Sequence, residues 1–552
     1  IRAVNGDTLQ KYTALVEKNL PRAGGILLSD EPARLLLVQA ALARDGRTKD
    51  FVPLETASLK YPFYHKFLHE EFPQKWPDTV TAAEETNGVA PLHLIRLLAA
   101  LAKTNNLYYL HPSFGYYFEL FYLEPHGLIY KLQTLPADTL LPPPSDKNLI
   151  AENEAFWAQA EKAAFAPIER ALSPSSPNAP QSFRQKLFSL LYLEPETNQN
   201  AVVVGNFYSR SLDFWGVQLQ RAGELDKAAA NFVLAQKLNP DNAVAGINLD
   251  FNRQLRAGKP ASVDLANVTL DQFGKLRTWS EILDADGPFD EPSYCFRDGL
   301  VMVRSGLLRQ AIAPFNRVRQ LVPDNLNARL WLGQLYVANH LPDRALAAVR
   351  DVSEQPEKFS LTSTNETQLA LIEAAAYFQK TNLTRGTQLL EAQISSHPTN
   401  EDLLAAAAQM YAARGLFTNA LAVIDRKLAL TPDDPAWLLG KGRIYLELKD
   451  YGDAIAALNR VLTLQTTNSQ ALYFRANAYF ASSNLDAARA DFETLRNTFT
   501  NSFQVAYGLG EIAWRKHDTN EAVKNYELFL ANVNTNAPEA KTVAERLREL
   551  KK

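Results

Sequence analysis

A repeat with a period of about 34 residues runs through the C-terminal half of the chain and restricts its fold more than any other feature. Units that begin at positions 367, 401, 435, 469 and 503 carry matching residue types at matching places. The eighth position of each unit is small: Ala374, Ala408, Gly442, Ala476 and Gly510. The twentieth is small as well: Gly386, Ala420, Ala454, Ala488 and Ala522. The twenty-fourth is large: Leu390, Ile424, Leu458, Phe492 and Tyr526. This period predicts stacked units of one kind rather than a single globular core.

Each unit is expected to be a pair of antiparallel helices. Small residues at positions eight and twenty let the two helices approach closely, and the large residue at position 24 fills the space beside that contact. A proline near the end of the unit, Pro398 or Pro432, stops the second helix. This pattern resembles the tetratricopeptide (TPR) repeat, which implies an α-solenoid of helical hairpins with one continuous core.

The same phase extends upstream with interruptions. Further units begin at positions 209, 292 and 326, and about seven extra residues around 360–366 shift the register. We predict a solenoid of about eight units in residues 209–536, with an irregular helical insertion at 258–291. Residues 537–552 predict a charged amphipathic helix that caps the open end of the stack.

Residues 1–150 lack the repeat and predict a small α/β domain, because short apolar runs alternate with helical patterns. The expected helices are at 7–20, 32–44, 61–72 and 91–103, and the expected strands at 26–28, 50–54, 107–110 and 127–135. Residues 151–208 are predicted as a helical linker region, with helices at 150–172, 183–193 and 201–222 and a loop at 173–181. The fold class is therefore mainly α, with a TPR solenoid preceded by a small α/β domain.

Composition argues against several partners. The 57 Lys and Arg residues nearly balance 61 Asp and Glu residues, and a net charge of -4 gives no general attraction to nucleic acid or an anionic membrane. A single cysteine, Cys295, excludes an internal disulfide. No apolar stretch approaches the ~20 residues needed to cross a bilayer, so we expect the chain alone to be soluble. Because it starts at Ile1 without a signal segment, we expect a processed product or a fragment.

A second resemblance covers the whole chain. The segments GGILLSDEPARLLLVQAAL (24–42), YPFYHKFLHEEFP (61–73) and LYYLHPSFGYYFE (107–119) precede the TPR units. Together they resemble the soluble C-terminal region of bacterial multi-pass membrane proteins of the O-mannosyltransferase-like (GT-C) type. The resemblance implies a preceding membrane-embedded glycosyltransferase domain that uses a lipid-linked sugar, with the soluble part on the periplasmic side. That family keeps its catalytic acid in the membrane part, so no catalytic residue is assigned here.

Several polar residues of the α/β domain are candidates for ligand chemistry. His65 and His69 lie four positions apart, which would suit a metal pair, but the spacing is more typical of a solvated helix surface. Asp30 follows a predicted strand, where α/β sheets often bind ligands, although Ser29 or Asp30 would equally serve as the N-cap of the helix at Pro32.

Aromatic residues concentrate between positions 107 and 130, and they suit core packing better than stacking on sugar rings. A possible ligand site consists of Asp30, His111, Tyr116 and Tyr117. The sequence contains no nucleotide-binding or hydrolase motif in this region. We predict no catalytic residue, metal or cofactor for this chain.

The first helix of each TPR unit is expected to line a concave groove that binds a protein or peptide. The nominated groove residues are Trp331, Gln334, Gln409, Arg443, Tyr473, Asn477, Tyr507 and Glu511. Ordinary inter-repeat packing or a solvated surface is an equally good explanation of these positions.

Three functions follow from these patterns. The leading hypothesis is a non-catalytic protein-interaction scaffold, which by resemblance is the extracytoplasmic region of a membrane glycosyltransferase-like protein; a cytoplasmic location stays open. One alternative is that the α/β domain takes part in glycosyl transfer or sugar recognition. The other is a structural module that self-associates in an envelope assembly.

Overall fold

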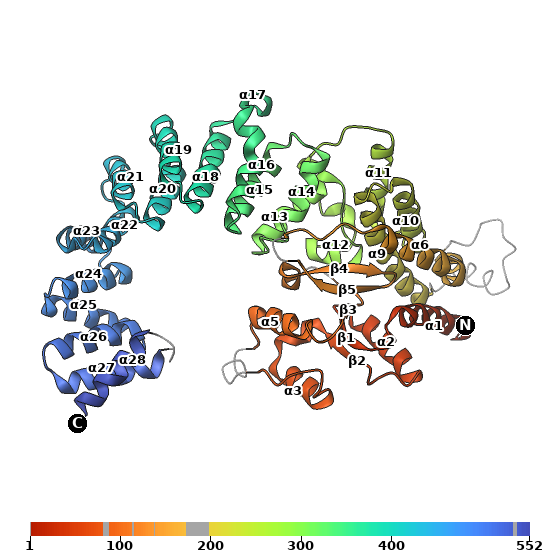
Figure 1. Ribbon diagram of the computed structural model, residues 1–552, viewed down its shortest axis with the longest axis horizontal. Coiled ribbons are helices and arrows are strands. Elements are labelled where there is room, and N and C mark those ends of the chain that lie inside the picture. The colour runs from red at the N-terminus through yellow and green to blue at the C-terminus, as the bar shows by residue number, and fades with distance from the viewer. Residues whose placement is uncertain are drawn as a thin grey trace, which may run out of the picture. The chain divides into compact units, whose positions relative to one another are not determined.

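The computed structural model describes residues 2–80, 88–112, 115–136, 139–172, 198–533 and 538–551 (Figure 1). The chain forms two compact units, residues 1–339 and 340–552. The helix predicted at 183–193 and the loop predicted at 173–181 lie outside the described residues. The boundaries predicted at residues 150, 208 and 536 separate segments defined by sequence pattern, and they remain predictions.

The first unit contains a five-stranded mixed sheet and a series of helices. The strands are β1 (Gly25–Ser29), β2 (Phe51–Glu55), β3 (Leu107–Tyr109), β4 (Phe121–His126) and β5 (Ile129–Thr134). The helices before the first TPR unit are α1 (Arg2–Asn19), α2 (Pro32–Arg44), α3 (Pro62–Glu71), α5 (Pro91–Leu101), α6 (Lys147–Ala160) and α7 (Ala166–Leu172). The later helices are α9 (Gln199–Arg221), α10 (Leu225–Leu238), α11 (Ala243–Arg256), α12 (Trp279–Ala285), α13 (Pro292–Arg304), α14 (Ile312–Leu321) and α15 (Leu326–Ala338).

The strand order is β2-β1-β3-β5-β4. Strand β1 pairs in parallel with β2 and with β3, so that Ile26 lies opposite both Val52 and Leu107. Strand β5 is antiparallel to β3 and to β4. The strand predicted at 127–135 corresponds to β5, which is the second strand of a hairpin. The sequence analysis did not predict its first strand, β4. Strand β4 contains Pro125, which a sheet tolerates here because β4 lies at its edge.

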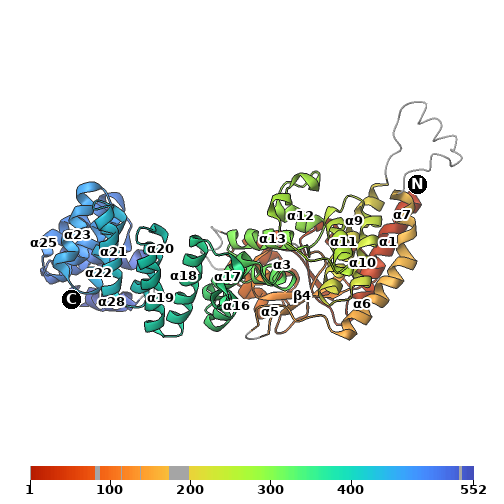
Figure 2. The same ribbon diagram turned by 90° about the horizontal axis from the view of Figure 1, so that it is seen from above.

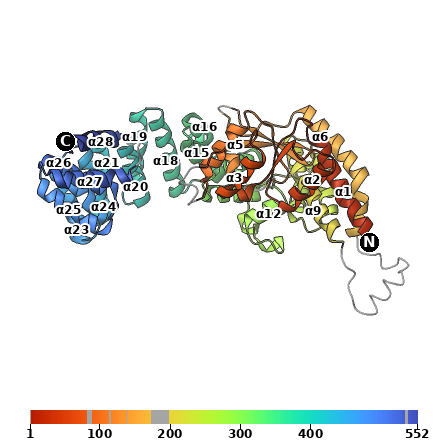
Figure 3. The same cartoon turned by 90° about the horizontal axis from the view of Figure 1, so that it is seen from below.

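Helices cover both faces of the sheet, and consecutive strand residues point to opposite faces. Leu27 packs in one buried cluster with residues of α1, α2 and α9, whereas Ile26 and Leu28 pack in another with residues of α3 and α5. Figure 3 shows α1 next to α2, and α1 also contacts α9. Because both faces are covered, every residue of β1 is buried.

The first of these clusters continues from the sheet into the helices that follow the linker. Tyr12 of α1 and Tyr208 of α9 are in edge-to-face contact, with ring centroids 5.4 Å apart. Trp215 of α9 and Phe232 of α10 belong to the same cluster. Helices α9, α10 and α11 lie side by side in Figure 2. The α/β part therefore shares its core with the first helical hairpin.

The second unit consists of helices. They are α16 (Pro342–Glu354), α17 (Pro356–Phe359), α18 (Ser363–Gln379), α19 (Leu383–Ser396), α20 (Glu401–Ala413), α21 (Phe417–Leu430) and α22 (Pro435–Glu447). They continue as α23 (Tyr451–Leu464), α24 (Ser469–Ala481), α25 (Leu485–Thr498), α26 (Phe503–Arg515), α27 (Thr519–Asn532) and α28 (Pro538–Leu550). From α18 to α27 each pair of consecutive helices is one repeat, as the period predicts.

Close helix contacts occur where the sequence predicts them. A Cβ atom added at Gly442, the eighth position of its unit, would lie 2.7 Å from Cγ of Leu458, the twenty-fourth position. The same pairing joins Gly510 to Tyr526, at 2.6 Å. The small residues therefore face the large residue of their own hairpin, and the expected helical pairs are confirmed.

The turn between the two helices of a unit repeats as well. One residue with a positive φ follows each first helix, at the same position of successive repeats: Thr381 (60°), Gly415 (70°), Lys449 (62°), Ser483 (66°) and His517 (58°). This left-handed conformation ends the first helix and reverses the chain, and it favours glycine, which occupies only one of these positions.

Helix α28 packs against the last hairpin. Val543 and Ala540 are buried in a cluster with Tyr526 and Phe529 of α27. Among the described residues, no helix combines the length and apolar character needed to cross a membrane.

Candidate functional site

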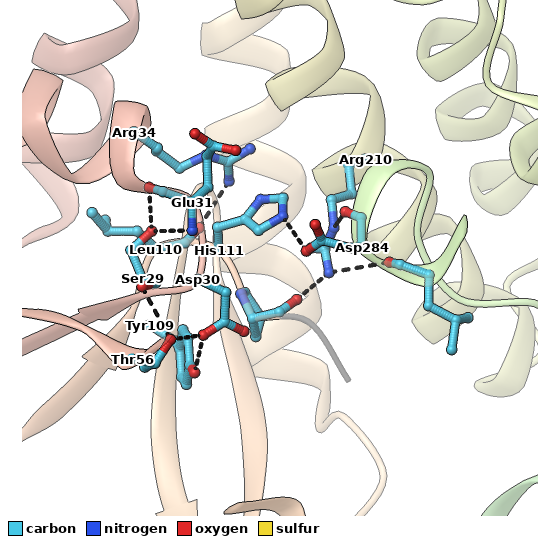
Figure 4. Close-up of polar contacts among 12 residues, drawn as sticks. Ser29, Asp30, Glu31, Arg34, Thr56, Tyr109, Leu110, His111, Arg210 and Asp284 are labelled. Carbon is cyan, nitrogen blue, oxygen red and sulfur yellow. Dashed lines mark hydrogen bonds and ion pairs between the residues drawn. The ribbon is translucent and has the colours of Figure 1, made fainter. Parts of the chain in front are cut away.

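Side chains from three strands meet at one edge of the sheet. Strands β1, β2 and β3 are parallel, so their carboxyl ends share an edge, and Asp30, Thr56 and His111 follow these strands. Strand β1 lies between β2 and β3, so the chain passes from β1 to its neighbour on one side, β2, and then crosses to its neighbour on the other side, β3. Open α/β sheets bind ligands at such a point. We call Asp30, Thr56, Tyr109 and His111 the carboxyl-edge site (Figure 4).

Asp30 accepts hydrogen bonds from two neighbouring side chains. The Tyr109 hydroxyl donates to Oδ1 of Asp30 at 2.6 Å, and the Thr56 hydroxyl donates to the same oxygen. Burial, together with the nearby Asp30 carboxylate, raises the pKa of Tyr109 well above its usual range. Tyr109 therefore stays a protonated donor.

The N-cap predicted for the second helix was wrong. Glu31, not Ser29 or Asp30, caps α2, and its carboxylate accepts a hydrogen bond from the Ala33 backbone N–H at 2.9 Å. The cap lies one residue later because Asp30 is engaged by Tyr109 and Thr56, and the Ser29 hydroxyl donates to the Glu31 carbonyl.

His111 lies between two arginines (Figure 4). Its Nε2 is 2.9 Å from Oδ1 of Asp284, which belongs to α12 in the predicted insertion. Burial lowers the pKa of His111 well below its usual value, and the positive charges of Arg210 and Arg34 lower it further. His111 is therefore neutral at pH 7.

Tyr116 and Tyr117 are placed near Asp30 but belong largely to the core. The Tyr116 hydroxyl donates to the Tyr117 hydroxyl at 3.2 Å, and Tyr117 is buried. Burial raises the pKa of both phenols, and the Asp30 charge adds to this effect. Tyr109, Phe121 and Tyr130 are buried as well, so the prediction of core packing for the aromatic stretch is confirmed.

The two histidines of α3 hold that helix to neighbouring loops. His65 Nε2 donates to the Leu59 carbonyl at 2.6 Å, and His69 Nδ1 donates to the Trp76 carbonyl at 2.8 Å. The prediction of a solvated helix surface was wrong for His65, which is 2% exposed. It is buried because α3 packs against the segment that contains Trp76, whose ring is 5.6 Å from the imidazole.

Three residues at this edge were missed by the sequence analysis. Arg34 of α2 and Arg210 of α9 are both buried, and Asp284 reaches His111 from α12. An arginine placed early in the mostly apolar segment PARLLLVQAALAR was a signal for Arg34. No local pattern marks Arg210 or Asp284, because both lie far from His111 in the sequence.

The nominated groove residues of the second unit lie on the first helix of each repeat. Helix α18 contacts α20, and α22 contacts α24, so first helices of successive repeats adjoin one another. Gln409 and Arg443 lie on α20 and α22; both side chains are exposed, and no carboxylate in the described part of the chain pairs with Arg443. Tyr473, Asn477 and Tyr507 are half-buried.

Several of the nominated residues have partners within the helical stack. Glu511 is buried, accepts a hydrogen bond from the Tyr526 hydroxyl at 2.9 Å and pairs with Arg546 of α28. The Asn477 amide donates to the Tyr473 carbonyl at 2.8 Å. In the first unit, Trp331 stacks on Phe315 with centroids 5.8 Å apart, and Gln334 is half-buried on the same helix, α15.

Comparison with known sequences identifies the repeat. Residues 299–357 and 405–471 match one tetratricopeptide repeat profile, and residues 445–512 match another. The chain carries tetratricopeptide repeats. TPR units are widely used to bind other proteins, so the repeats indicate a protein-interaction scaffold. None of the curated proteins matches this chain.

Solved TPR structures are similar to part of the chain. The C-terminal part of a TPR repeat-containing protein from Cytophaga hutchinsonii is 16% identical with a TM-score of 0.37, over 45% of this chain and 98% of that protein. A TPR protein from Parabacteroides merdae is 14% identical with a TM-score of 0.34, over 47% of this chain and 99% of the other. PilW, a type IV pilus biogenesis factor, is 19% identical with a TM-score of 0.31, over 39% of this chain and 96% of its own.

Proposed function

We propose that the repeats of the second unit hold an extended segment of a protein partner against their first helices. One observation carries this proposal: Arg443 is an exposed cation on a first helix, and no carboxylate in the residues described pairs with it. The neighbouring Lys441, in contrast, pairs with Asp425 at 2.7 Å. A guanidinium without an internal partner is suited to bind a carboxylate of another chain.

The side chains around Arg443 suit a peptide backbone. Gln409 lies at the same position of the preceding repeat and Asn477 at the same position of the following one, so amide groups flank the cation along the stack. Tyr473 and Tyr507 add half-buried aromatic surface on the next two first helices. Amides hydrogen-bond to peptide groups and aromatic rings supply contact area, so the partner segment is expected to contain an acidic residue next to apolar ones.

A charge-reversal experiment tests the groove. A displayed library of random peptides is selected on the full chain, and we expect enrichment of sequences with Asp or Glu. Arg443→Glu should abolish that enrichment. The matched control is Arg426→Glu, which makes the same change on an exposed arginine of a second helix, α21. Equal enrichment on both variants, or no enrichment on the natural chain, would contradict the proposal.

We further propose that the chain works outside the cytoplasm beside a membrane glycosyltransferase-like domain. This proposal rests on the sequence resemblance of residues 24–42, 61–73 and 107–119. Reading the gene upstream of Ile1 tests it, since several long apolar segments are expected there. An upstream coding sequence without long apolar segments would argue against this context.

A further inference from the structure

Two buried arginines lie on either side of His111 beside the carboxyl edge of the sheet. Arg34 is 0% exposed and Arg210 is 4% exposed. Arg34 Nη1 donates to the Leu110 carbonyl at 2.8 Å, and Arg210 Nη2 donates to the Pro112 carbonyl. Leu110 and Pro112 flank His111 in the chain, so both guanidinium groups are held close to the imidazole (Figure 4). We call Arg34, His111 and Arg210 the arginine cluster.

The arginine cluster contains buried polar atoms that lack hydrogen-bond partners. Within the described residues, Nε and Nη2 of Arg34, Nη1 of Arg210 and Nδ1 of His111 have no partner. Buried polar atoms without a partner are rare in folded proteins, and each one is unfavourable, more so when it is charged. Open guanidinium donors and an open imidazole nitrogen thus lie in one small region.

The charges of the cluster are only partly compensated. Asp284 binds His111 through Oδ1 and lies at the surface, with a side chain 45% exposed. Asp213 also acts on Arg210, but burial raises the pKa of its carboxyl well above the usual range, which disfavours its charged form. Glu31 is near Arg34, but its carboxylate caps α2. The Arg34 guanidinium lies over the Phe207 ring, 4.2 Å from its centroid, so an aromatic face and not a carboxylate covers it. Two buried cations without a bidentate carboxylate are the kind of site that binds an anion.

His111 makes the arrangement selective. Since the Asp284 carboxylate accepts from Nε2, that nitrogen carries the proton of the neutral imidazole, and Nδ1 is left as an acceptor. An acceptor between two cationic donors suits an anion that itself carries a proton. Phosphate has such a proton near neutral pH, whereas sulfate does not.

We propose that Arg34, His111 and Arg210 bind a phosphate group that carries at least one proton. The open N–H groups of Arg34 and Arg210 donate to phosphoryl oxygens, and Nδ1 of His111 accepts the hydrogen bond from the P–OH group. The phosphate belongs either to inorganic phosphate or to a phosphate monoester.

Calorimetric titration of the full chain at pH 6.5 in a phosphate-free buffer tests the site. Inorganic phosphate should bind saturably with one site per chain and raise the unfolding temperature, since a ligand that binds only the folded state stabilises it. Sulfate should bind at least tenfold more weakly. Glycerol phosphate is the third probe: tighter binding than inorganic phosphate assigns the site to esters, and weaker binding assigns it to the free ion.

Two variants and a control decide which residues are responsible. Arg34→Met should weaken phosphate binding at least tenfold. Arg47→Met is the matched control, because Arg47 also donates to a carbonyl, that of Pro21 at 2.8 Å, and lies over a phenylalanine ring, that of Phe51 at 5.4 Å. Arg47→Met should bind phosphate as tightly as the natural chain does.

His111→Gln keeps a polar group for Asp284 but removes the Nδ1 acceptor, so it should bind phosphate and sulfate equally. If Arg34→Met fails to fold, this loss of selectivity in His111→Gln still tests the proposal. The proposal is overturned if phosphate gives no saturable binding, if sulfate binds the natural chain as tightly as phosphate, or if Arg34→Met and Arg47→Met bind alike.

Discussion

Burial alters the chemistry of single side chains at the carboxyl edge of the sheet. His111, Arg34 and Tyr109 all lie where the protein replaces water, and each has its pKa shifted against its charged form. His111 is the most informative of the three because its unperturbed pKa, about 6.5, lies in the pH range in which the protein can be studied in its folded state.

The depressed pKa of His111 predicts a pH effect on stability. Below about pH 6.5 the unfolded chain binds a proton at this histidine and the folded chain does not, so stability falls as the pH falls. Between pH 7 and pH 5.5 we expect the natural chain to lose about 1 kcal/mol more than His111→Gln. Urea unfolding of both proteins at the two pH values measures the difference.

Asp286 titrates in the same pH range with the opposite effect on stability. Burial raises the pKa of Asp286 to about 7, so this carboxyl stabilises the fold as the pH falls, opposite to His111. Both proteins contain Asp286, and its contribution cancels in the comparison. Identical pH slopes for the two proteins would show that His111 does not titrate as inferred.

Within each helical pair, the close contacts depend on small residues at fixed positions. Helix α22 contains two glycines that differ in their surroundings: a Cβ at Gly442 would meet Leu458 at 2.7 Å, whereas the nearest neighbour of a Cβ at Gly440 is Ile424 Cδ1 at 4.0 Å. The repeat requires a small side chain only at the first of these positions.

The two glycines predict substitutions of opposite sign. Gly442→Val forces a branched side chain against Leu458, so we expect a loss of about 1–3 kcal/mol. Gly440→Ala removes backbone freedom from the unfolded chain without a clash, and a gain of about 0.5–1 kcal/mol is expected. Urea unfolding midpoints followed by circular dichroism compare the two. A stabilising Gly442→Val would mean that the helices are not in the close contact described.

Over the length of the first unit, the sheet and the helices after the linker depend on a common core. Tyr12, Leu27 and Phe51 are buried together with Tyr208 and Trp215, which come much later in the sequence. A chain that ends near residue 150 would leave these apolar surfaces in water.

A truncation experiment follows from this shared core. We expect residues 1–150 alone to lack a cooperative thermal transition, and residues 1–339 to unfold cooperatively. Differential scanning calorimetry and amide NMR spectra of the two fragments provide the comparison. A cooperative transition of the short fragment would support an independent α/β domain, as the sequence analysis assumed.

Periodic features of this protein could be read directly from its residues. The regular alternation of small and large residues predicts helical pairs, because contacts within a hairpin join fixed positions of one unit, such as Gly442 and Leu458, and repeat with the chain. The parallel strands β1, β2 and β3 were also predicted, since short buried strands are apolar along their whole length.

The groove assignment of Glu511 and the capping of α2 depended on neighbours that sequence patterns do not specify. Arg546 of a later helix pairs with Glu511, and Tyr109 and Thr56 engage Asp30. The arginine cluster is the extreme case: its members come from α2, the end of β3 and α9, and Asp284 from an insertion without a period. Local propensity and spacing report contacts that recur along the chain, whereas a site built from single, distant residues exists only once the chain has packed.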